Sequence, residues 1–115
     1  MAEKWFEYKI QQILEDDEFL VINCARSKPF DLIAIKRGVV YLIEIKGKNT
    51  KYPEEQYERQ VKLAHKAEAN MAVIRKTPAR GVVTISFPVQ YDVILPLKNA
   101  LIKEYAVIEE EASEG

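Results

Sequence analysis

The spacing of apolar residues divides the chain into helical and strand-like segments. Residues 3–16 (EKWFEYKIQQILED) place apolar side chains at helical spacing, which predicts an amphipathic helix. Residues 19–23 (FLVIN) form a short apolar run typical of a strand. A second helix is predicted over residues 54–69, with Tyr57, Val61 and Ala64 on its apolar stripe. Residues 71–76 (MAVIRK) and 82–87 (VVTISF) predict two further strands, the second of them ended by Pro88.

Between the first strand and the second helix, two apolar runs flank Arg37 and Gly38. Glycine accepts a positive φ without steric cost, so this pair predicts a two-residue hairpin turn. The second run, residues 39–46 (VVYLIEIK), is apolar on both faces until Glu44, which indicates a central strand covered on both sides. If the strand at residues 71–76 runs parallel to this one, the helix over residues 54–69 would form a right-handed crossover between them.

The C-terminal part gives a weaker pattern. Residues 91–95 predict a short edge strand or an extended segment, and Pro96 can start a last helix through about residue 107. Leu97, Leu101 and Tyr105 would form the inner side of that helix. Residues 109–115 (EEEASEG) predict a disordered acidic tail, because their charges are too dense to bury. We therefore expect one domain over residues 1–108.

Composition limits the classes of protein that fit. The 115 residues, 48% of them apolar, suffice for one domain with a real core. The net charge of -1 argues against non-specific coating of nucleic acid. Residues 109–114 hold four of the eighteen acidic residues, so the rest carries seventeen basic and fourteen acidic side chains and remains compatible with DNA. Cys24 is the single cysteine, which fits a reducing compartment. Without a signal peptide or a span of roughly 20 apolar residues, we expect a cytoplasmic protein and no membrane partner.

The hairpin register brings charged residues together. A turn at residues 37–38 pairs Lys36 with Val39 and places Asp31 directly opposite Glu44, with Cβ atoms roughly 5 Å apart. Lys46 lies two residues beyond Glu44 and therefore on the same face. Facing like charges are destabilising unless positive charge lies between them, and a divalent cation together with a lysine would supply it. Carboxylate oxygens suit Mg²⁺ or Mn²⁺.

These residues resemble a known family. Over residues 7 to about 87 the chain resembles the PD-(D/E)xK nuclease superfamily, and most of all the archaeal Holliday junction resolvases. The resemblance rests on Glu7 in the first helix, then FLVINCARSKPFDLIAI, then YLIEIKGK, followed by a helix and two strands. The resemblance implies an α/β fold with a restriction-endonuclease-like core, a central mixed β-sheet flanked by helices in the order α-β-β-β-α-β-β. It also implies a Mg²⁺-dependent endonuclease, with Mn²⁺ as a substitute, that cuts branched DNA such as four-way junctions as a homodimer.

The resemblance also implies roles for individual residues. Asp31 and Glu44 would ligate Mg²⁺ together with the backbone carbonyl of Ile45. Lys46 would orient or activate the attacking water, and Glu7 would complete the acidic cluster directly or through water. Taken alone, Glu7 has an alternative interpretation as a solvated helix glutamate.

DNA contacts are predicted on the loops around this site. Ser27 and Lys28 match the serine-containing loop of the resolvases, Arg26 lies beside them, and Lys48 and Lys51 follow the central strand. Weaker candidates are Arg75, Lys76 and Arg80, and Asn23 and Tyr8 stand where junction resolvases usually carry basic residues. Two alternatives stay open: a nuclease of the same fold with another DNA substrate (repair, restriction-like or mobile-element), and a non-catalytic nucleic-acid-binding or assembly module.

Overall fold

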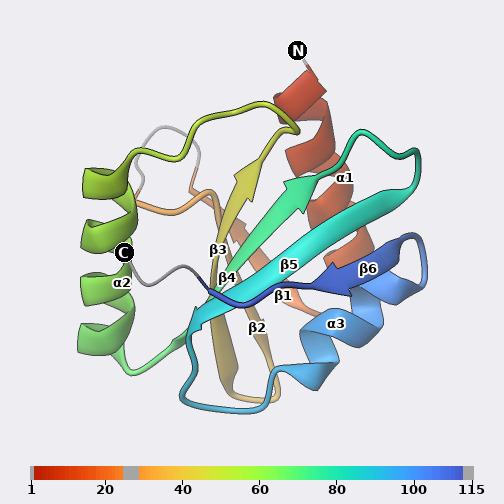
Figure 1. Ribbon diagram of the computed structural model, residues 1–115. Coiled ribbons are helices and arrows are strands. Elements are labelled where there is room, and N and C mark those ends of the chain that lie inside the picture. The colour runs from red at the N-terminus through yellow and green to blue at the C-terminus, as the bar shows by residue number, and fades with distance from the viewer. Residues whose placement is uncertain (1, 25–28, 113–115) are drawn as a thin grey trace.

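The computed structural model describes residues 2–24 and 29–112 (Figure 1). Its elements, in chain order, are α1 (Ala2–Asp16), β1 (Leu20–Asn23), β2 (Leu32–Lys36), β3 (Val39–Lys46), α2 (Glu54–Ala67), β4 (Asn70–Lys76), β5 (Val82–Val89), α3 (Leu95–Ile102) and β6 (Ala106–Glu109). The six strands form one mixed sheet in the order β1-β2-β3-β4-β5-β6. The predicted fold class is confirmed. No helix in the described part of the chain is long and apolar enough to cross a membrane.

The sheet lies between two helical layers. Figure 1 shows α2 on one face and α1 and α3 on the other. The larger core joins Phe6 and Ile10 of α1 and Leu97 of α3 to the sheet, and all three are buried. A smaller core packs Ala64 of α2 against the other face. Amphipathic helices that each bury one stripe against a sheet account for this arrangement.

The central hairpin has the register that the sequence predicts. β2 and β3 are antiparallel, with Lys36 opposite Val39 and Leu32 opposite Ile43. Arg37 and Gly38 both have positive φ, 52° and 81°, as a twisted two-residue turn requires. A Cβ atom at Gly38 would meet nothing within 4 Å, so the glycine serves the backbone conformation rather than a close approach.

β3 is a central strand, as predicted. Its residues 41–46 are all buried, and it pairs antiparallel with β2 and parallel with β4. Tyr41, Ile43 and Ile45 belong to the larger core, whereas Leu42 belongs to the core under α2. Because side chains alternate along a strand, Glu44 and Lys46 share the face covered by α2.

The expectation that Pro88 ends the fifth strand is wrong, because β5 continues to Val89. Met71 pairs with Val89 but Val73 pairs with Ser86, so one extra residue of β5 is accommodated opposite β4. Such a bulge leaves a residue out of the hydrogen-bonded ladder, and proline, which has no N–H to donate, is tolerated there.

Residues 91–94 do not form an edge strand. The side-chain oxygen of Asn70 accepts the backbone N–H groups of Tyr91 and Asp92 at 2.8 and 3.0 Å, and the carbonyl of Val93 accepts the Tyr41 hydroxyl at 2.6 Å. Side chains from the sheet thus satisfy this backbone in place of a neighbouring strand.

The predicted last helix is too long at its C-terminal end. α3 ends at Ile102, and β6 follows in parallel alongside β5. Tyr105 lies beyond the helix but still packs against the larger core. Glu109, which the sequence assigned to the acidic tail, is the last residue of β6, and the N–H of Glu110 donates to the carbonyl of Ile85 at 2.8 Å. The sheet therefore continues past residue 108.

Candidate active site

Two carboxylates and a lysine lie together beneath α2. Asp31 precedes β2, while Glu44 and Lys46 lie at the end of β3, and all three are buried, with exposed fractions of 3%, 2% and 6%. The Nζ atom of Lys46 is 3.3 Å from Oε2 of Glu44. Charged side chains are rarely buried to this extent unless they are paired or bind an ion. The cluster therefore needs a physical account.

Asp31 is fixed by contacts to β3. Its backbone N–H donates to the carbonyl of Ile43 at 3.0 Å, and its Oδ2 accepts the backbone N–H of Ile45 at 2.8 Å. The hairpin register, extended by one residue, places Asp31 opposite Glu44. The structure therefore brings Asp31, Glu44, Lys46 and the backbone of Ile45 into one site.

The electrostatics of Glu44 are unfavourable for its charged form. Burial raises the pKa of Glu44, and the negative charge of Asp31 raises it further. A hydrogen bond from Gln60 and the charge of Lys46 lower the pKa, but they only partly offset the first two effects. Additional positive charge beside the two carboxylates would relieve this cost. Hard oxygen donors from Asp31, Glu44 and the Ile45 carbonyl fit Mg²⁺ in chemical type.

α2 and the loop before it contribute residues that the sequence did not single out as functional. The Nε2 atom of Gln60 donates to Oε1 of Glu44 at 2.8 Å, and Nε2 of Gln56 lies 3.4 Å from Oε2. The Tyr52 hydroxyl donates to Oε1 of Gln60, and its ring centroid lies 4.7 Å from Nζ of Lys46. Gln60 is buried and Gln56 is half-buried, so neither belongs to the exposed polar face of α2. A signal was nevertheless present, because Gln60 lies within the apolar stripe that ends at Ala64.

Glu7 belongs to a different helical layer from α2. It is half-buried on α1, which covers the opposite face of the sheet, and it lines a cavity with Tyr8 and Asn23. Within residues 2–24 and 29–112, no three Asp, Glu, His or Cys side chains gather closely enough to hold a metal ion. The role of Glu7 stays a prediction.

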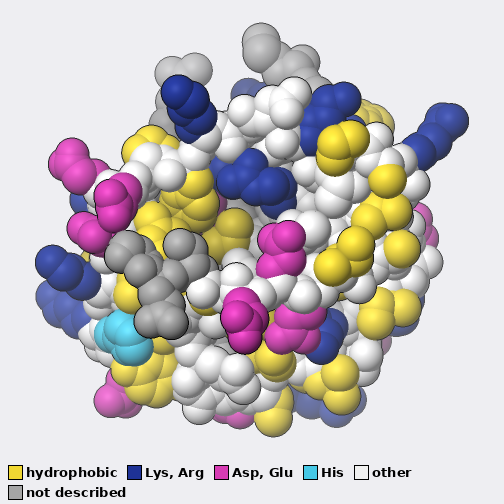
Figure 2. All heavy atoms as spheres, in the orientation of Figure 1, with side chains coloured by type: hydrophobic (Ala, Val, Ile, Leu, Met, Phe, Trp, Pro, Cys, Tyr) yellow, Lys and Arg dark blue, Asp and Glu magenta, His cyan; other side chains and the backbone are white. Residues whose placement is uncertain are grey.

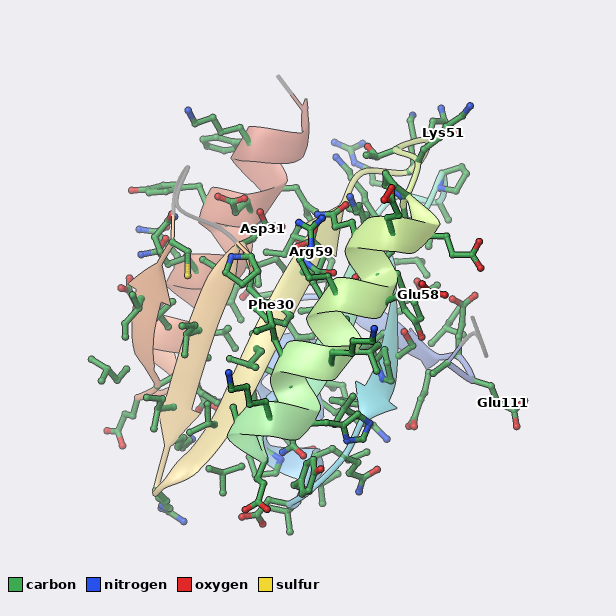
Figure 3. All side chains as sticks on the ribbon, turned by 90° about the vertical axis from the view of Figure 1, so that its left-hand side faces the viewer. Phe30, Asp31, Lys51, Glu58, Arg59 and Glu111 are labelled. Atoms are coloured by element: carbon green, nitrogen blue, oxygen red, sulfur yellow. The ribbon has the colours of Figure 1, made fainter. Side chains whose placement is uncertain are left out.

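The predicted DNA contacts are only partly placed. Arg26, Ser27 and Lys28 lie outside the described residues. Lys48 and Lys51 are exposed on the loop between β3 and α2, where Figure 3 shows Lys51 projecting beyond the N-terminal end of α2.

Arg75, a weaker DNA-binding candidate, has a structural task in this loop. Its Nη1 donates to the carbonyls of Gly47 and Thr50 at 3.0 and 2.8 Å. It thereby ties the start of the loop to β4.

The two sides of α2 differ in charge. Toward β4 and β5 the surface is hollowed (Figure 2), and this cavity of about 410 Å³ is lined by Tyr57, by three acids, Glu54, Glu110 and Glu111, and by Arg75. Figure 3 shows Arg59, which is exposed, on the other side of the helix.

Comparison with known proteins shows a likeness of fold to solved structures. No family model and no curated protein sequence matches the chain. Among solved structures, the chain is similar to Hjc, a Holliday junction resolvase from the archaeal hyperthermophile Archaeoglobus fulgidus, with a TM-score of 0.63 and 22% sequence identity over 74% of this chain and 71% of that chain. At this identity the likeness is one of fold, and it establishes that the mixed sheet and its helices form the restriction-endonuclease-like core of that resolvase.

Proposed function

We propose that this protein is a metal-dependent DNA endonuclease that cuts four-way junctions as a homodimer. The observation that carries the proposal is the burial of Asp31, Glu44 and Lys46 together at the end of the central hairpin, on a fold shared with a junction resolvase. Two opposed carboxylates beside a lysine cost stability in a buried site. A catalytic role of these charges would explain why the protein keeps them despite the lost stability.

The residues divide the work of phosphodiester hydrolysis between them. Asp31, Glu44 and the carbonyl of Ile45 would hold Mg²⁺, and Glu7 would add to this acidic set. The ion supplies Lewis acidity that neutralises charge developing on the phosphate. Lys46 is a compact positive charge held by Glu44 and can orient the attacking water or the scissile phosphate.

DNA would approach from the side of α2 that carries Arg59. Arg26, Ser27 and Lys28 precede Asp31 in the chain, and Lys48 and Lys51 extend from the loop after β3. Phosphate contacts from these residues position the backbone without reading its sequence. The acidic cavity on the far side of α2 disfavours the opposite approach.

A nicking assay tests the function. The purified chain should cut a labelled four-way junction in millimolar Mg²⁺ and cut nothing in EDTA, and Glu44→Ala should abolish cleavage. Glu58→Ala is the matched control, since Glu58 is an exposed glutamate of α2. Cleavage by Glu44→Ala at the wild-type rate would show that the site is wrongly assigned.

The substrate panel separates the junction proposal from its alternatives. Two symmetric cuts need two sites, so the active species should sediment as a dimer. Equal cutting of a junction and a matched linear duplex would point to a repair, restriction-like or mobile-element nuclease of the same fold. Absence of both cleavage and calorimetric Mg²⁺ or Mn²⁺ binding at millimolar concentration would instead indicate a non-catalytic module.

A further inference from the structure

Gln60 is a buried polar side chain on the core-facing stripe of α2. Only 1% of its surface is exposed, although the neighbouring stripe positions Tyr57, Val61 and Ala64 are apolar or aromatic. An aliphatic residue would fill this position without the desolvation penalty of a carboxamide. The amide is tolerated because both its nitrogen and its oxygen have hydrogen-bond partners.

The three partners of Gln60 permit a single orientation of its amide. Nε2 donates to the carbonyl of Pro29 at 2.6 Å and to Oε1 of Glu44 at 2.8 Å, while Oε1 accepts the hydroxyl of Tyr52. A carbonyl and an ionised carboxylate can only accept, so both must face the NH₂ group. A flipped amide would place its oxygen against two acceptors and lose both of those bonds, whereas the Tyr52 hydroxyl, which can accept as well as donate, would still find a partner.

These partners come from the three segments that build the site. Pro29 stands two residues before Asp31, Glu44 lies on β3, and Tyr52 belongs to the loop that carries Lys48 and Lys51. The ring of Tyr52 also lies over the ammonium of Lys46. One carboxamide thus links the two carboxylate-bearing segments to the loop that is proposed to contact DNA.

We propose that Gln60 is a positioning residue that fixes the carboxylate of Glu44 relative to the Asp31 segment, and that Tyr52 holds the oxygen end of its amide in place. This inference rests on the proposed function, because it assigns Gln60 a part in the same hydrolysis. When the loop is seated, the Tyr52 hydroxyl holds the amide oxygen and both N–H bonds point at their acceptors. When Tyr52 withdraws, the buried amide oxygen loses its donor, and the side chain is held only by its two N–H bonds. The loop position is thereby coupled to the geometry of the site.

The test is a double-mutant cycle on cleavage by the full chain. Gln60→Met keeps the length of the side chain without its hydrogen bonds, and Tyr52→Phe keeps the ring over Lys46 without the hydroxyl. Each should lower kcat by about 10- to 100-fold, the effect of one lost charge-assisted hydrogen bond, with KM for DNA within about twofold of wild type. The double variant should be no slower than Gln60→Met alone, because Tyr52 acts through Gln60. Gln90→Met, an exposed substitution, should leave kcat unchanged.

The outcomes separate positioning from packing. A purely structural role would lower Tm while the folded fraction retained its kcat, and that result would overturn the inference. Effects of the two substitutions that multiply in the double variant would also overturn it.

A second readout stays independent of cleavage. The side-chain ¹⁵NH₂ signals of Gln60 should move in Tyr52→Phe, and unchanged signals would refute the link to Tyr52. An inactive wild type would refute the proposed function. In that case the same signals would still show whether the Tyr52 hydroxyl contacts the amide of Gln60.

Discussion

Replacing Glu44 by glutamine separates two explanations of the buried charge cluster. The substitution removes the negative charge and keeps the shape of the side chain and an oxygen that can accept from Gln60. If Glu44 is a structural counter-ion for Lys46, the variant leaves a buried ammonium without its ion pair. If the site is arranged to bind a cation, the variant removes a repulsion that the metal-free protein must otherwise tolerate.

The two explanations predict opposite changes in the free energy of unfolding. Loss of one partner of a buried ion pair costs about 3–5 kcal/mol. Asp31, at the roughly 5 Å of a directly opposed pair, repels Glu44 by about 3 kcal/mol at an effective dielectric constant of about 20. The hydrogen bond from Gln60 and the charge of Lys46 offset part of this repulsion. The pKa of Glu44 nevertheless remains raised, so its ionised form destabilises the fold. We therefore expect Glu44→Gln to gain about 1–2 kcal/mol at neutral pH, which corresponds to a Tm increase of about 4–10 °C.

Thermal unfolding followed by circular dichroism in EDTA measures this difference. A carboxyl group with a raised pKa in the folded state costs stability as the pH rises from 4.5 through that raised pKa, so the advantage of the variant should shrink at acidic pH. Mg²⁺ at about ten times its Kd should stabilise the wild type by about 1.4 kcal/mol and the variant by less. A Tm of Glu44→Gln several degrees below that of the wild type in EDTA would refute the reasoning and identify a structural ion pair.

Three further substitutions test the fold away from the site. Asp17→Asn removes the negative charge that pairs with Lys103 and Lys36 and should cost about 0.5–1 kcal/mol in urea unfolding at pH 7. Since these partners lower the pKa of Asp17, the cost should disappear as the pH falls from 3.8 through that lowered pKa. Arg37→Asn should increase the free energy of unfolding by about 0.5 kcal/mol and so raise the urea midpoint, because asparagine adopts the positive φ of this turn more easily than arginine. An unchanged midpoint would contradict this. Leu97→Ala should cost about 2–4 kcal/mol in the same assay, because Leu97 is fully buried between α3 and the sheet, and a loss below 1 kcal/mol would mean that the core refills the cavity.

The hairpin was the most predictable part of the fold. A turn at Arg37 and Gly38 fixes every pairing in β2 and β3, and the alternation of side chains then decides which residues share a face. The facing of Asp31 and Glu44 followed from this counting alone. α1 and α2 followed from long apolar patterns, which are the strongest signals in a single sequence. The parallel pairing of β3 with β4 stood only as a condition for the crossover until the structure showed it.

The C-terminal part was less predictable because its signals overlap. Leu97, Leu101 and Tyr105 continue one helical stripe, so the end of α3 at Ile102 leaves no mark in their spacing. β6 has four residues and ends in Glu109, and a short strand beside charged residues resembles a loop. Its place in the sheet depends on pairing with β5, a long-range contact that no local pattern reveals.

The charged residues of the candidate site could be predicted from the sequence, but the residues that hydrogen-bond to them could not. Asp31, Glu44 and Lys46 stand out because charges interrupt apolar strands. Gln60 and Tyr52 act through hydrogen bonds that join residues 8 to 31 positions apart. Spacing within one helix shows that Gln60 is turned toward the core, but the carboxylate it meets there depends on how α2 packs on β3.

The distribution of buried polar residues argues that this cluster serves function. Among the described residues, Asn70 is also buried and polar, and its contacts explain why: its side chain holds the turn that leads to α3. Asp31, Glu44, Lys46 and Gln60 instead bond mainly to one another and to the segments that carry them. Apolar residues of similar volume would pack the same strands and helix without opposed carboxylates or a raised pKa at Glu44. Burying these charges lowers the stability of the fold without being needed for packing, and the cost is concentrated beneath one helix of a resolvase-like fold. This is the physical reason to look for catalysis there.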